Sequence, residues 1–179
     1  MTSAPAIELR SFTDLDAVRG DLLDVYAEVR APLLHLANYA VSSFGERVDR
    51  HGAEDGFQAV LAYEDGHPVG YAYGNRIEDG DRYWQRMDPA PSEKYTARAA
   101  VALKEIGVRP AWRGLGVARR VHDAFLASRD EPYATLMVNP AAGDGKVHAL
   151  YQSWGYVDLG HSQPSPASPR LTVMIRSTV

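Results

Sequence analysis

The sequence contains no cysteine, which excludes disulfide bonds, thiolate catalysis, iron–sulfur clusters and cysteine-ligated zinc. It also has no apolar run near the roughly 20 residues that a membrane helix needs. The first ten residues carry neither a basic start nor an apolar stretch, so no signal peptide is visible. These absences predict a cytoplasmic protein with no membrane partner.

Basic residues are fewer than acidic residues. The chain has 19 Lys and Arg against 23 Asp and Glu, a net charge of -4, which argues against a general nucleic-acid binder. The 6 histidines are scattered, and no pair has a metal-ligand spacing such as His-x-x-x-His. We therefore expect neither a nucleic-acid partner nor a bound metal.

The 179 residues, 45% of them hydrophobic, predict one domain over 1–179 with a single sizeable core. Apolar periodicity predicts strands that run together and helices that intervene in places, hence an α+β fold with a mixed sheet. The expected strands are 7–10, 59–63, 69–73, 101–108, 134–138, 156–159 and 171–175, and the expected helices are 14–30, 43–52, 114–128 and 147–154. The charged stretch from residue 76 to 94 is expected to begin as a long loop.

Two helix starts show capping-box spacing. Thr13 followed by Asp16 predicts the start of the first helix, and Ser43 followed by Glu46 predicts the start of the second. The glycine at position 52 predicts where the second helix ends.

The segment from Arg109 to Arg120 lies between an expected strand and an expected helix. Its small residues let a ligand approach the backbone, and the first N–H groups of a helix together with the helix dipole form an anion site. Four arginines, with no acidic residue between Ile106 and His122, make the segment locally positive. A phosphate-bearing ligand fits this best, although a glycine-rich helix start on a basic surface gives the same pattern. The segment is not a Walker A loop, and Arg119 occupies the third glycine position of a dinucleotide fingerprint.

Arg113-Gly114-Leu115-Gly116-Val117-Ala118 resembles the Gln/Arg-x-x-Gly-x-Gly/Ala signature of the GNAT acyltransferase superfamily. The stretch from Leu103 to Pro110 looks like that family's central strand, and Ala149 to Tyr156 is similar to its second motif. The expected order of strands and helices is also the GNAT order. Asp144 and Val147 depart from the second motif, where the family often has Asn and Ala, so contacts of that Asn to CoA are not transferred.

The resemblance implies a GNAT fold with a central mixed, splayed sheet flanked by helices, splayed near Ile106. It implies direct transfer of the acetyl group of acetyl-CoA, a cosubstrate, to a primary amine, without metal. The residues expected to bind the pantetheine arm are Ile106, Gly107 and Val108, and those expected to bind the pyrophosphate are Arg113, Gly114, Leu115, Gly116, Val117, Ala118 and Arg119.

Two residues are the catalytic candidates. Tyr151 matches the family's usual general acid, because a hydroxyl with a pKa of about 10 can protonate a departing thiolate; the alternative is an ordinary core tyrosine. Glu105 lies on the expected central strand, where a carboxylate is costly to bury without a function or a partner. It is either the general base or half of a structural ion pair with an arginine. His122 is expected on a solvated helix face.

The acceptor is expected to be a small-molecule amine. Residues 31–56 and 76–95 are expected to line its binding site. Asp79, Asp81 and Asp88 suit a cationic amine, although such a loop is more often simply solvated. Rival interpretations are a non-catalytic CoA-binding or sensor module of the same fold, and a nucleotide-binding regulator. The C-terminal strands predict a homodimer, because family members often pair strands there.

Overall fold

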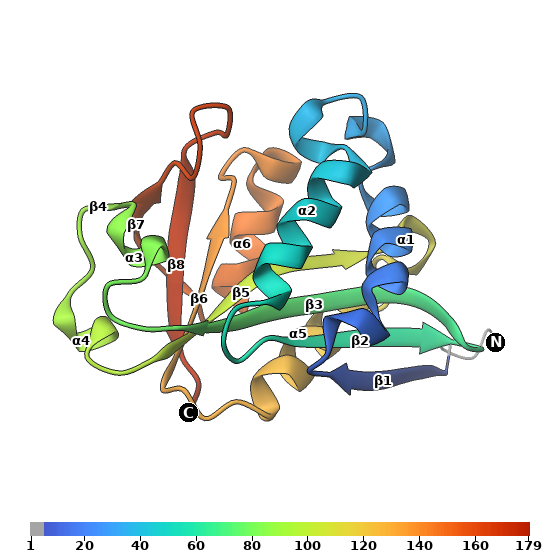
Figure 1. Ribbon diagram of the computed structural model, residues 1–179, viewed down its shortest axis with the longest axis horizontal. Helices are drawn as coiled ribbons and strands as arrows, with labels where there is room; N and C mark the ends of the chain where they lie inside the picture. Colours follow the sequence, from blue (N-terminus) through green and yellow to red (C-terminus); the bar gives the residue numbers. More distant parts are fainter. Residues whose placement is uncertain (1–5) are drawn as a thin grey trace. The chain divides into compact units, whose positions relative to one another are not determined.

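The computed structural model describes residues 6–179; residues 1–5, part of the segment without a signal-peptide pattern, lie outside the described residues. The chain forms two compact units, which comprise 6–75 with 104–129 and 76–103 with 130–179. Strands follow the hydrogen-bonded order β1-β2-β3-β5-β6-β8-β7-β4 in a mixed sheet (Figure 1). This confirms the expected mixed α/β fold.

In the first unit, β1 and β2 pair antiparallel, as do β2 and β3. Figure 1 shows helices α1 and α2 on the same side of these strands. The elements are β1 (Ile7–Phe12), α1 (Arg19–Val29), α2 (Val41–Gly52), β2 (Gln58–Glu64), β3 (His67–Ile77), β5 (Ala100–Val108) and α5 (Val117–Ala127). The last residues of β3 and the first residues of β5 belong to the second unit.

Alternation along the hairpin builds this core. Leu61 and Tyr63 on β2 and Tyr71 and Tyr73 on β3 pack with buried side chains of α1 and α2. The intervening residues of β2 are buried as well. Since alternate residues point to opposite faces, β2 is covered on both sides, and α5 contacts it. These two strands confirm the predicted strands over 59–63 and 69–73.

Both predicted capping boxes are wrong. Asp14, not Thr13, caps the start, and its carboxylate accepts from the N–H of Asp16 at 3.0 Å. This cap opens the short 3-10 helix Leu15–Ala17, and α1 follows from Arg19. The Ser43 hydroxyl donates to the Ala37 carbonyl at 2.7 Å, so it holds the preceding turn and α2 starts two residues earlier than predicted.

In the second unit, β5 and β6 pair in parallel through Val101–Leu103, while β6 with β8, β8 with β7, and β7 with β4 pair antiparallel. Its core gathers buried side chains of β3, α3, β5 and β8, including Trp84 and Ile175. The further elements are α3 (Arg82–Gln85), β4 (Met87–Asp88), α4 (Glu93–Thr96), β6 (Tyr133–Val138), α6 (Lys146–Ser153), β7 (Val157–Ser162) and β8 (Leu171–Ser177).

The long loop expected from residue 76 is only partly present, because this stretch contains α3, β4 and α4. Side-chain caps start both helices: Asp81 accepts from the N–H of Tyr83 at 2.8 Å, and Ser92 accepts from the N–H of Lys94 at 3.3 Å. The rings of Tyr83 and Trp84 are buried at an edge-to-face angle of 90°. Core packing of these aromatic rings, which the charge pattern concealed, orders the segment.

Candidate active site

The glycine loop after β5 is built for close approach to the backbone. Gly114 and Gly116 have φ of +77° and +79°, in the left-handed region where a side chain is strained. Apart from the glycine itself and its two chain neighbours, no heavy atom lies within 4 Å of where a Cβ would stand on either glycine. Gly116 is the N-cap of α5 and supplies no side chain to cap it. The first backbone N–H groups of α5 therefore have no hydrogen-bond acceptor within the helix. Such N–H groups at a helix start can bind an anion.

The arginines around this loop are less available than the sequence predicts. Arg109 donates to the Pro68 carbonyl at 2.7 Å and pairs with Glu28 at 2.6 Å. Arg119 pairs with Asp123, one turn along α5, at 2.9 Å. Carboxylates from outside the 106–122 window thus offset part of the positive charge of the loop.

Arg113 differs from these two arginines. Its Nε donates to the Val108 carbonyl at 3.1 Å, which folds the side chain back along the end of β5. It makes no ion pair with any of residues 6–179. Its charge is therefore the one within the motif best placed for an external anion.

Close packing holds the end of β5 next to β3. A Cβ on Gly107 would lie 3.2 Å from the ring of Tyr71, and a Cβ on Gly70 would lie 3.0 Å from Val117. The N–H of Arg109 donates to the Val69 carbonyl at 2.9 Å. Glycine at these points lets the strand that carries Ile106, Gly107 and Val108 lead directly into the glycine loop.

Glu105 is surrounded by groups that the sequence did not associate with it. Its side chain is 12% exposed, and its Oε2 lies 3.7 Å from Nη2 of Arg47 on α2. The Tyr71 hydroxyl donates to its Oε1 at 3.4 Å. Burial raises the pKa of the Glu105 carboxyl, and the nearby arginines oppose this shift only in part. A buried carboxylate with a raised pKa can serve as a base near neutral pH.

His51 is a second polar group that sequence spacing missed. Its Nδ1 lies 3.0 Å from the Tyr73 hydroxyl. Burial, helped by the charges of Lys104, Arg47 and Arg50, lowers the pKa of His51 to about 3, so the ring is neutral at physiological pH. Neither His51 nor Arg47 lies in a motif; helix α2 brings them to this region, and no sequence signal marks them.

Tyr151 lies on α6 in the second unit. The turn before this helix ends at Gly145, whose φ of +86° sets its start. The Tyr151 side chain is 7% exposed and meets the rings of Trp154 and Tyr156 edge to face, with centroids 5.5 and 6.0 Å away. The ring is thus held rigidly within an aromatic cluster.

The prediction for His122 is wrong. Its side chain is fully buried, and its Nδ1 lies 2.8 Å from an Asp123 carboxylate oxygen. His122 lies on the buried face of α5, which packs against β2. His122 is therefore not part of a solvated face.

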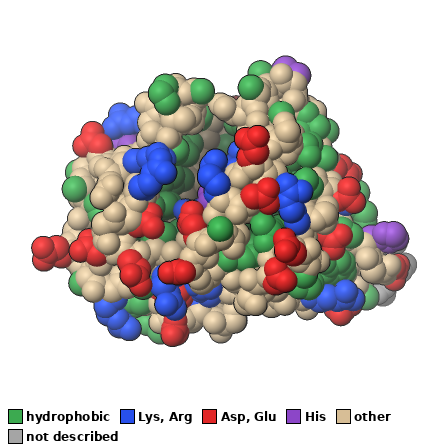
Figure 2. All heavy atoms as spheres, viewed as in Figure 1, with side chains coloured by type: hydrophobic (Ala, Val, Ile, Leu, Met, Phe, Trp, Pro, Cys, Tyr) green, Lys and Arg blue, Asp and Glu red, His purple; other side chains and the backbone are tan. Residues whose placement is uncertain are grey.

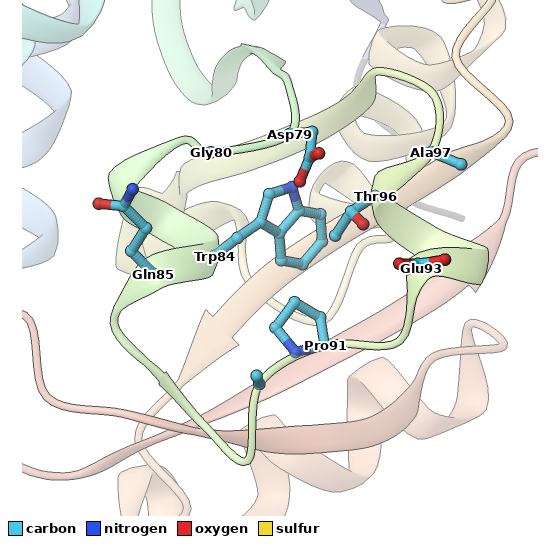
Figure 3. A pocket seen from close by; sticks show the side chains of 9 residues that line it. Asp79, Gly80, Trp84, Gln85, Pro91, Glu93, Thr96 and Ala97 are labelled. Carbon is cyan, nitrogen blue, oxygen red and sulfur yellow. The ribbon is translucent and has the colours of Figure 1, made fainter.

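The second unit also holds a pocket of about 370 Å³ (Figure 3). Its lining includes the carboxylates of Asp79 and Glu93 beside the Trp84 ring and Pro91. Asp79 belongs to the stretch that the sequence associates with a cationic acceptor. Neither predicted catalytic residue lines this pocket.

Within residues 6–179, no helix is long and apolar enough to cross a membrane, and no three His, Cys, Asp or Glu side chains gather as a metal site would require. On the face shown in Figure 2, acidic and basic side chains are interspersed.

Residues 55–158 match the family described as acetyltransferase (GNAT) domain. No curated protein matches the chain at a significant level. Among solved structures, an acetyltransferase from Thermus thermophilus is similar, with 17% identity, a TM-score of 0.65, and coverage of 98% of this chain and 99% of that chain.

Two further structures are similar. The PaiA N-acetyltransferase from Thermoplasma acidophilum, in complex with coenzyme A, has 11% identity and a TM-score of 0.60, with 96% of this chain and 99% of that chain covered. The ribosomal-protein-S18-alanine N-acetyltransferase from Escherichia coli has 13% identity and a TM-score of 0.63, with 96% and 94% covered. At these identities the likeness shows the fold alone.

Proposed function

Because the chain belongs to the GNAT acetyltransferase family, we propose that it is an N-acetyltransferase that moves the acetyl group of acetyl-CoA directly to a primary amine, favouring a small-molecule acceptor. The observation that carries this proposal is the glycine loop at the start of α5. There, two left-handed glycines with open space above them lead to helix amides that suit a pyrophosphate.

The residues of this loop fit the proposed cosubstrate. Backbone N–H groups of the stretch from Arg113 to Arg119 would hold the pyrophosphate, and the Arg113 guanidinium would add a charge. The backbone of Ile106, Gly107 and Val108 would pair with the pantetheine arm. One backbone N–H at this point would polarise the thioester carbonyl, as an oxyanion hole does.

Two side chains would move protons. Glu105 would take the proton from the attacking amine, and its raised pKa makes it a stronger base than an ordinary glutamate. Tyr151 would donate its hydroxyl proton to the leaving thiolate, from a ring held in place by Trp154 and Tyr156. The acetyl group would pass directly to nitrogen, without a metal or an acyl-enzyme.

The second candidate function is a non-catalytic CoA-binding or sensor module. The contact between Arg47 and Glu105 favours it, since that pair has the geometry of a structural ion pair. A panel of amines incubated with acetyl-CoA, with free thiol followed over time, separates the two. Thiol release that depends on an amine supports the enzyme, whereas CoA binding without release supports the module.

The pH dependence tests Glu105. We expect kcat/KM to rise with pH through the raised pKa of Glu105, because only the carboxylate accepts a proton. Arg47→Gln removes a cation that lowers this pKa, so the rise should move to higher pH. Glu105→Gln should lower activity about 100-fold and remove the part of the rise that Glu105 contributes. The acceptor's own ionisation is common to all three proteins. A pH profile unchanged in Glu105→Gln would exclude it as the base.

We also propose a single GNAT domain over 1–179, since the family match runs through parts of both units. A cytoplasmic location and the absence of nucleic-acid and membrane partners remain part of this proposal. The support is the acidic composition and the lack of a spanning helix within residues 6–179.

Self-association is a further expectation. Strand β7 contains Val157, which is 59% exposed, and such a side chain suits contact with a second copy. Light scattering at micromolar concentration should give about twice the 19.7 kDa chain mass. A monomer mass at that concentration would remove the homodimer.

A further inference from the structure

Arg30, at the end of helix α1, carries a charge that no ion pair within the described residues balances. It makes no ion pair with residues 6–179, and its Nε is buried without a hydrogen-bond partner. The nearest acidic residue in sequence, Glu28, is already engaged by Arg109 at 2.6 Å. The Arg30 guanidinium instead lies 5.7 Å from the ring centroid of Tyr39. A half-buried cation without an ion-pair partner costs free energy, so its presence points to an anion from outside.

A second arginine contacts the same turn. Arg47, on α2, donates to the Asn38 carbonyl at 3.5 Å, next to the residue that Arg30 faces. The Tyr26 hydroxyl donates to the Tyr39 carbonyl at 3.0 Å and fixes this turn between the two helices. Both arginines therefore lie against one short segment, Ala37–Tyr39.

The charges in this region do not balance. The Glu105 carboxylate lies 3.7 Å from Arg47, and Arg30 also acts electrostatically on it. Among these three groups, two guanidinium groups therefore share one carboxylate, which leaves one positive charge over. His51 adds no charge, because its ring is neutral at physiological pH.

We propose that the acceptor is an amine that also carries a carboxylate, and that Arg30 pairs with this carboxylate while Glu105 faces the amino group. This inference rests on the proposed function. A guanidinium recognises a carboxylate through paired N–H groups. A single carboxylate matches the single surplus charge, whereas a phosphate monoester would bring almost two negative charges next to Glu105. A polyamine would meet the surplus positive charge and be repelled.

The test compares matched acceptors. The common L-amino acids and short ω-amino acids are each assayed with acetyl-CoA beside their carboxamides, together with phosphoethanolamine and spermidine. The wild type should favour the best carboxylate acceptor over its carboxamide by about 10-fold to 100-fold in kcat/KM. Arg30→Gln should remove this preference mainly by raising the KM of the carboxylate acceptor. Arg30→Lys should keep part of it.

Arg19→Gln is the matched control, because Arg19 lies on the same helix and pairs with Asp49 at 2.7 Å, so the preference should persist. Equal use of acids and carboxamides, or a preference for phosphoethanolamine or spermidine, overturns the proposal and leaves the acetyltransferase standing. If no amine is acetylated, the proposed function fails instead. In that case, calorimetric titration of the same acids into the wild type and Arg30→Gln tests whether Arg30 binds a carboxylate. Equal binding to both proteins, or binding to neither, overturns the Arg30 site.

Discussion

Gly116→Arg is expected to abolish CoA binding, with a loss of at least about 100-fold in affinity. Gly116 stands at the start of α5, with no heavy atom within 4 Å of where its Cβ would be. That open space is where a pyrophosphate would meet the helix amides. A long side chain would fill the space and shield the helix end, so the loss follows from exclusion of the ligand. Titration calorimetry with CoA measures it.

Backbone strain needs its own control, since Gly116 has a φ of +79°. Gly66, in the turn between β2 and β3, has a φ of +80° and equally open surroundings. Gly66→Arg therefore carries the same strain and charge and should bind CoA normally. Arg113→Ala should weaken binding less than Gly116→Arg, because the backbone N–H groups remain. CoA fragments that lack phosphate should bind the wild type and these variants with equal affinity. Equal CoA binding by wild type and Gly116→Arg would remove the phosphate-site assignment.

Tyr151→Phe is expected to lower turnover about 100-fold while the affinity for CoA hardly changes. The substitution keeps the ring in its contacts with Trp154 and Tyr156 and deletes only the hydroxyl. If that hydroxyl protonates the leaving thiolate, its loss affects the transition state and not the bound state. Steady-state turnover, measured beside calorimetric CoA affinity, separates the two effects.

Tyr156→Phe is the matched control, because it removes a hydroxyl from the same aromatic cluster. Its ring also lies in the core, and its turnover should stay near that of the wild type. Thermal melting of both variants reports any structural cost of losing a buried donor. Full activity in Tyr151→Phe would mean that water, not this tyrosine, protonates the thiolate.

Periodicity predicted most of the fold because burial imposes it. The alternation along β2 and β3 and the helical spacing in α5 both follow the faces that pack in the core. Capping was harder to predict. Asp14 and Thr13 are both good caps, and only the geometry of the chain decides that the Asp14 carboxylate accepts the bond. Likewise, the charges between residues 76 and 94 concealed the core contacts of Tyr83 and Trp84.

The candidate site could likewise be predicted only in part. The glycine loop could be predicted from sequence because left-handed turns and helix starts require particular residues at fixed local spacing. The surroundings of Glu105 could not, since Arg47 and Tyr71 come from a distant helix and strand. The charge of the loop was overestimated for a related reason. Glu28, far away in sequence, folds back onto Arg109.

Acetyl transfer itself tests most directly whether this chain is an N-acetyltransferase. The purified protein is incubated with acetyl-CoA and the amine panel, and both free CoA thiol and N-acetylated product are quantified, with Gly116→Arg as the inactive control. We expect free CoA thiol and N-acetylated product in equal amounts, both dependent on the amine and both lost in Gly116→Arg. Tight CoA binding by the wild type without any acetylated amine would contradict this expectation and identify the chain as a binding module.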